Sequence, residues 1–168
     1  MARKKKADKV VAQEESLVYK GEITLTMMHG NKVIKKLRKS NTGKGPLFQY
    51  LMYCLTGTLY PTKVPKYLRV FDASDDELTT REIPTTGTPS YTFDNSSASA
   101  VVTFNLSSTA LKQLTGLKKY RIYSSENASS SQVANYSAEV VLDTPEVITE
   151  GSTLIVAWKM TLSNKVGG

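Results

Sequence analysis

The chain has 168 residues, which is the length of one domain, or of one domain that carries an arm. Its single cysteine excludes an internal disulfide, and no apolar run approaches the ~20 residues of a membrane-spanning helix. The basic start of the chain is not followed by the apolar stretch of a signal peptide, so we expect neither export nor a membrane. Val, Ile, Thr, Tyr and Phe recur between Ser- and Thr-rich stretches, which favours strands over helices.

The net charge of +7 is concentrated at the N-terminal end. Residues 1–44 hold twelve Lys or Arg and four Asp or Glu, a net charge of +8, whereas residues 45–168 hold ten and eleven, a net charge of −1. Such a region is either a solvated tail and strand face or a surface that docks on a polyanion or an acidic protein. The docking candidates are Arg3, Lys4, Lys5, Lys6 and Lys9 in a terminal cluster, and Lys35, Lys36, Arg38 and Lys39 in a second cluster that also includes Lys32 and Lys44.

In chain order, the first predicted elements are an arm and a hairpin. Residues 1–16 are polar and charged without a period, which predicts an extended basic arm. From 17 to 28 apolar and polar residues alternate, as in a half-buried strand. Gly30 and Asn31 are a turn signal, and residues 33–39 predict a second, very basic strand that returns beside the first.

One short helix is predicted, at about 46–56. Pro46 suits its first turn, and Gly57 suits its end. The apolar residues between them follow helical spacing, so we expect them to pack into the core: Leu47, Phe48, Leu51, Met52 and Leu55.

The rest of the chain predicts further strands and a long loop. Residues 72–89 are acidic and then rich in Thr and Pro, which predicts an exposed loop. With the hairpin, the total is seven or eight strands, so we expect residues 17–168 to form a single antiparallel β-sandwich with the helix inserted. The further strands are predicted at 66–71, 91–93, 100–106, 120–123, 135–142 and 153–162, and 107–115 allows a short helix.

Residue patterns typical of catalysis or ligand binding are not found in the sequence. His29 is the only histidine, and the helical apolar spacing around Cys54 indicates a buried cysteine. The acidic triplet 75–77 lacks the alternation and the glycine of a calcium loop, and residues 43–45 lack the flanking residues of a phosphate loop. We therefore expect no enzyme, no catalytic residue, no cofactor and no metal.

Two blocks of the sequence resemble small β-rich virion proteins of tailed double-stranded DNA bacteriophages. Residues 39–71 follow the order strand, Asn/Gly turn, short helix with a Leu-x-Gly end, and strand, and residues 151–164 resemble the closing strand, with Trp158 in its middle. The resemblance implies a structural role in the virion, as a head fibre, decoration, collar or tail module that is assembled in the host cytoplasm. It implies capsid, portal, collar or fibre subunits as partners, and a homo-oligomer is compatible with it.

Three functional hypotheses remain open on the sequence. The leading one is a structural virion component that docks on neighbouring subunits through its basic N-terminal region. The second is a nucleic-acid-binding protein that uses the arm and the basic hairpin, although no recognition helix or zinc-finger spacing is visible. The third is a receptor- or carbohydrate-binding tip that uses Tyr91, Tyr123 and Tyr136. Trp158 is expected either in the sandwich core or at a subunit interface, where Trp is enriched.

Overall fold

A computed structural model describes residues 16–43, 65–93, 97–124 and 136–165 of the chain, and these residues are mainly β-structure. The first two strands form a hairpin, and one turn of 3-10 helix, Ser108–Ala110, follows the sixth strand. The strands are β1 (Ser16–His29), β2 (Lys32–Gly43), β3 (Pro65–Phe71), β4 (Ile83–Pro84), β5 (Ser90–Phe93), β6 (Ser97–Ser107), β7 (Leu117–Ser124), β8 (Ala138–Glu146) and β9 (Thr153–Lys165).

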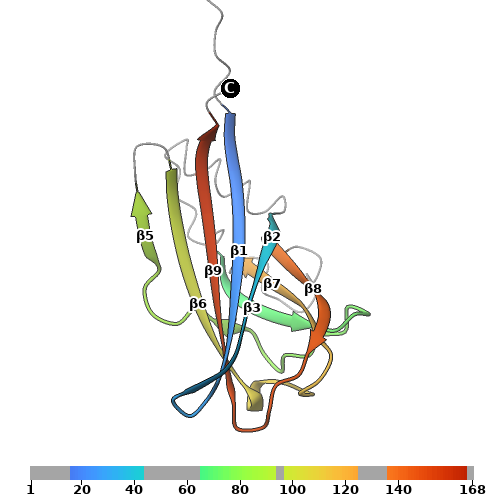
Figure 1. The fold of residues 1–168 in the computed structure, drawn as a ribbon. Coiled ribbons are helices and arrows are strands. Elements are labelled where there is room, and N and C mark those ends of the chain that lie inside the picture. Colours follow the sequence, from blue (N-terminus) through green and yellow to red (C-terminus); the bar gives the residue numbers. More distant parts are fainter. Residues whose placement is uncertain (1–15, 44–64, 94–96, 125–135, 166–168) are drawn as a thin grey trace, which may run out of the picture.

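The strands form two antiparallel sheets (Figure 1). The first sheet has the order β2-β1-β9-β6-β5, with the long strands β1, β9 and β6 side by side. The second sheet has the order β4-β3-β7-β8. Strand β2 also pairs with β8 at Thr42 and Gly43, so the two sheets are continuous at that point.

The core lies between the two sheets and follows from the alternation of apolar residues along each strand. In β1, Ile23, Leu25 and Met27 are buried, and every second residue points outward. Ile23 is paired with Trp158 of β9, whose side chain is fully buried. The structure therefore places Trp158 in the core, one of the two positions that its sequence pattern allowed. The second sheet faces this layer with its own buried residues, among them Leu68, Val70, Tyr120, Ile122, Val140 and Leu142.

The two lateral sides of the sandwich differ. On one side the segment after β4 crosses to the first sheet, where Thr85 bridges Phe104 and the Thr86 amide donates to the Thr103 carbonyl at 2.6 Å. On the other side β2 and β8 are paired only at Thr42 and Gly43 and then separate, as Figure 1 shows. One side is thus closed by backbone hydrogen bonds, and the other is open along most of β2.

The predicted antiparallel two-sheet architecture is confirmed. The predicted helix at about 46–56 lies outside the described residues, and the residues that the structure does describe contain no α-helix, so that part of the prediction is not borne out. The expectation of an exposed loop at 72–89 holds only in part: most of the segment is exposed, but Leu78, Thr79 and Ile83 are buried, and Ile83 belongs to β4, a strand the sequence did not reveal. A two-residue strand is too short for any periodicity to show.

Candidate docking surface

The two basic clusters of the sequence have different outcomes. Arg3, Lys4, Lys5, Lys6 and Lys9 lie outside the described residues. Lys35, Lys36, Arg38 and Lys39 all lie on β2, the strand that forms the open side of the sandwich.

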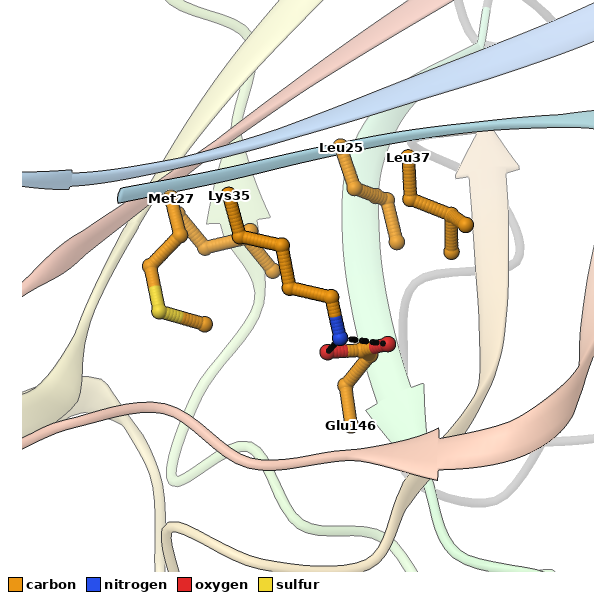
Figure 2. Close-up of a pocket in the computed structure, with 6 residues that line it drawn as sticks. Leu25, Met27, Lys35, Leu37 and Glu146 are labelled. Atoms are coloured by element: carbon orange, nitrogen blue, oxygen red, sulfur yellow. Dashed lines mark hydrogen bonds and ion pairs between the residues drawn. The ribbon is translucent and has the colours of Figure 1, made fainter. Parts of the chain in front are cut away.

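Lys35 and Lys39 point from β2 toward β8. They pair with Met27 and Ile23 of β1, whose side chains are buried. The Lys35 ammonium lies 2.7 and 2.8 Å from the two carboxylate oxygens of Glu146, and Figure 2 shows this contact spanning the gap between the strands. The Lys39 ammonium donates to Asp143 at 2.5 Å, and this bond lowers the pKa of the Asp143 carboxyl. Side chains, not backbone hydrogen bonds, therefore connect β2 to β8 along this stretch.

The opposite row of β2 side chains faces outward. Arg38 lies 3.2 Å from the Glu22 carboxylate on β1, with 68% of its side chain exposed. Lys32 and Lys36 are exposed and make no ion pair with any residue that the structure describes. Two ammonium groups on this strand are therefore available to a carboxylate from outside the chain.

A small recess lies beneath the gap between β2 and β8. Four apolar side chains line it, and the Lys35–Glu146 pair lies at its rim (Figure 2). The recess is shallow and partly open to solvent. The apolar lining consists of Leu25, Met27, Leu37 and Leu154.

On the side away from β1, most of the β2 backbone has no pairing partner among the residues that the structure describes. Its ladder with β1 runs from Lys32 to Asn41, whereas its ladder with β8 holds only Thr42 and Gly43. We call residues 32–41 of β2 the docking edge. An edge strand presents alternate N–H and C=O groups that no neighbouring strand satisfies, so it is a template for another strand.

The far end of the docking edge is anchored on β1. The Tyr19 hydroxyl donates to the Asn41 side-chain oxygen at 3.3 Å, and burial raises the pKa of Tyr19 to about 12. Gly21 makes room for the Asn41 side chain, because a Cβ at position 21 would lie 1.2 Å from the Asn41 oxygen. The docking edge is thus fixed at the end where it meets β8.

No relative is found for this chain. No family model matches it, no curated protein is similar to it, and no solved structure matches its fold. Within the described residues, no helix is long and apolar enough to cross a membrane, and no group of three or more His, Cys, Asp or Glu side chains is placed to hold a metal ion.

A second charged cluster, which the sequence did not reveal, lies on the outer face of the second sheet. Arg69 of β3 and Arg121 of β7 are register partners with side chains 4% and 8% exposed. Arg69 binds both carboxylate oxygens of Glu77, at 2.8 and 2.5 Å. Arg121 binds Glu139 at 2.7 Å and also Asp75. We call these five residues the arginine cluster.

Aromatic rings complete the arginine cluster. The Arg121 guanidinium lies 4.5 Å from the Phe71 ring centroid and 4.6 Å from that of Tyr136, and Arg69 lies 5.4 Å from that of Tyr123. Lys119 lies 2.9 Å from Asp75, and its hydrogen bond, followed by those from Arg121, lowers the pKa of the Asp75 carboxyl. With Lys119, the cluster has three cations and three carboxylates, and it holds the acidic segment 72–77 against the sheet, so we assign it to the fold.

The remaining candidate residues do not form a site. His29 Nδ1 lies 3.2 Å from the Ser152 hydroxyl, and Cys54 lies outside the described residues. Of the three tyrosines expected at a sugar-binding tip, Tyr123 is buried and packs edge-on against Tyr136, whereas Tyr91 is 60% exposed and lies on the other sheet. The structure therefore does not bring these rings onto one surface.

Proposed function

We propose that this chain is a non-enzymatic structural component of a phage virion, which docks on neighbouring subunits through its basic N-terminal region. The placement in a virion rests on the resemblance of residues 39–71 and 151–164 to virion proteins. The docking part rests on the geometry of β2.

One observation carries the proposal: along the most basic strand of the chain, residues 32–41 pair with β1 on one side and with no other described strand on the other. Docking candidates Lys35, Lys36, Arg38 and Lys39 lie on β2, with unpaired backbone beside them. A surface of this kind offers directional hydrogen bonds together with charge, and both are used where one protein subunit adds to another.

The rest of the fold supplies a rigid body behind this surface. Backbone bonds close the opposite side of the sandwich, and the arginine cluster fixes the segment after β3. A docking module benefits from such rigidity, because less conformational entropy is lost when it binds.

The test is the composition of purified particles. Particles produced by the genome that encodes this chain are purified through a density gradient and analysed by quantitative mass spectrometry. We expect the chain at a fixed ratio to the major capsid protein, and the same ratio after a second gradient. Presence in the host lysate together with absence from the particles would reject the proposal.

A further inference from the structure

We infer that the docking edge binds an extended acidic segment of a partner subunit, which adds to the first sheet as an extra strand beside β2. The inference rests on the proposed function, because it names the kind of partner that such a module docks on. It is argued from the backbone, the charges and the apolar contacts of β2.

The backbone supplies the first argument. Residues 32–41 have a pairing strand on one side only, and none of the backbone hydrogen bonds from the described loops reaches this stretch. Added strands bind mainly through their main chain and obtain specificity from alternate side chains. The stretch is as long as or longer than a typical strand of about 5–6 residues, so it can accept a complete ladder.

The charges select the partner. The cations Lys32, Lys35, Lys36, Arg38 and Lys39 lie within eight successive positions of β2. A second copy of β2 placed alongside would set cations against cations, which destabilises a pair of strands. Lysines on an edge guard it against this self-association. A strand with carboxylates at alternate positions meets the outward-facing Lys36 and Arg38 as attractive partners.

Three of the five cations of β2 form ion pairs with carboxylates of the chain itself. Glu22, Asp143 and Glu146 bind Arg38, Lys39 and Lys35, whereas Lys32 and Lys36 are left without an ion pair among the described residues. The surroundings of the docking edge therefore carry five cations and three carboxylates, a local net charge of +2. Nucleic-acid binding depends on uncompensated positive charge along the phosphate backbone, so this surface fits an acidic strand better than a polynucleotide.

Apolar contacts supply the third argument. Val33 and Ile34 are 52% and 51% exposed at the start of β2. Beyond them, the recess lined by Leu25, Met27, Leu37 and Leu154 opens next to the free backbone. The side chains of an added strand alternate between the two faces of the sheet. One face of the partner strand would thus be acidic, and the other would carry small apolar residues.

The experiment uses the full chain and synthetic peptides. The probe is an end-blocked peptide of about nine residues with Glu at alternate positions and Val or Thr between them. Two control peptides have the same sequence, but every second backbone nitrogen is methylated, at the odd positions in one peptide and at the even positions in the other. In one of the two, the methyl groups replace the amide hydrogens that would face β2, while the charge of the peptide is unchanged. Binding is measured by peptide-detected fluorescence anisotropy, and strand addition by amide hydrogen exchange of residues 32–41.

We expect the unmodified peptide to bind and to slow exchange of alternate amides within 32–41. One of the two methylated peptides should bind at least about tenfold more weakly, because its main chain no longer donates hydrogen bonds to β2. Equal affinity of all three peptides, or binding without slower exchange in this stretch, would overturn strand addition. Tighter binding of a single-stranded oligonucleotide that displaces the peptide would overturn it in favour of nucleic acid, and a dimer of the free chain that protects the same amides would overturn it in favour of a second copy.

A matched pair of variants tests the charge. Lys36→Glu reverses an exposed cation of the docking edge, and Lys66→Glu reverses an exposed cation of β3 on the second sheet. We expect Lys36→Glu to weaken peptide binding about fivefold and Lys66→Glu to leave it unchanged. Equal losses in both variants would reject selection by this edge. The peptide assay does not depend on particles, so the two proposals can fail separately. If the chain is present in virions but the peptide does not add as a strand, only this inference is rejected. If the chain is absent from virions, only the proposed function is rejected.

Discussion

The arginine cluster and the docking edge hold ion pairs of similar length in very different surroundings. Arg69 and Arg121 have side chains 4% and 8% exposed, whereas those of Lys35 and Arg38 are 54% and 68% exposed. The N···O distances are similar, 2.5 to 2.8 Å for the Arg69 and Glu139 contacts and 2.5 to 3.2 Å on the docking edge. Distance alone therefore does not show which pairs matter for folding.

The difference in burial indicates that the arginine cluster stabilises the fold, whereas the cations of the docking edge are available to a partner. Water weakens an exposed pair and solvates both partners when it opens, so such a pair contributes about 0–1 kcal/mol. A buried cation that loses its partner stays in a medium that solvates it poorly. The arginine cluster should thus behave as part of the core, while the cations of the docking edge can exchange their carboxylates for those of a partner.

The largest expected effect is the loss of Arg121. Arg121→Ala leaves Glu139 and Asp75 without their shared cation and removes the contacts of the guanidinium with the Phe71 and Tyr136 rings. We expect the free energy of unfolding to fall by about 3 kcal/mol, measured by urea denaturation at neutral pH. Arg121→Lys should recover little of it, because an ammonium cannot bind two carboxylates in the planar geometry of a guanidinium. A loss below about 1 kcal/mol would show that burial does not distinguish the two clusters.

A smaller effect of opposite sign is expected at Tyr120, next to the gap. Its hydroxyl is buried and has no hydrogen-bond partner among the described residues, and burial, followed by the charge of Glu146, raises its pKa. Tyr120→Phe removes this unsatisfied group, so we expect a gain of about 1 kcal/mol in the free energy of unfolding. Tyr123→Phe is the control, because the Tyr123 hydroxyl interacts with Arg121 and its removal should not stabilise the protein. A loss in Tyr120→Phe would contradict the prediction.

Most of the strands could be predicted from the sequence because one face of each packs against the core. The alternation of β1 and of β9 is regular over more than ten residues, and the structure pairs them as Ile23 with Trp158 and Leu25 with Val156. Period-two patterns of this length have few other interpretations. The turn signal at Gly30 and Asn31 indicated the β1–β2 hairpin, but the other pairings were not predictable, because they depend on long-range contacts that periodicity does not encode.

The arginine cluster was not predicted because its arginines fit the alternating pattern of an ordinary half-buried strand. Arg69 lies between Leu68 and Val70, and Arg121 lies between Tyr120 and Ile122, so each looks like the solvated face of a half-buried strand. The segment 72–77 covers that face, which makes it a second buried layer. The sequence did hold one indication: two arginines within predicted strands, and the acidic triplet 75–77 shortly after the end of β3. Opposite charges placed this way could have predicted ion pairs between them.

The ion pair across the gap should contribute less than either buried feature. A double-mutant cycle with Lys35→Ala and Glu146→Ala measures the coupling between the two side chains. We expect a coupling of about 0.5 kcal/mol, because the Lys35 side chain is 54% exposed to water. A coupling above about 2 kcal/mol would mean that this contact locks β2 to β8, and that the docking edge is less available than we propose.

The smallest expected effect is a change in the pKa of Asp75. It tests whether an exposed member of the arginine cluster depends on its neighbours as the buried members do. Asp75 is 51% exposed, and its pKa is lowered mainly by the Lys119 hydrogen bond and then by Arg121. A carboxyl with a folded pKa below its unfolded value contributes stability above about pH 4 and loses it as the pH falls through the folded pKa. Lys119→Ala should raise the pKa of Asp75 toward its ordinary value, measured by carboxyl-detected NMR, and reduce the acid sensitivity of the fold only slightly. Asp143 in the same spectra is the control: its pKa should stay low in Lys119→Ala and rise in Lys39→Ala. If Asp75 keeps its low pKa without Lys119, the buried Arg121 alone keeps this carboxyl ionised, although half of the Asp75 side chain is exposed. An exposed carboxylate would then belong to the arginine cluster as firmly as the buried ones.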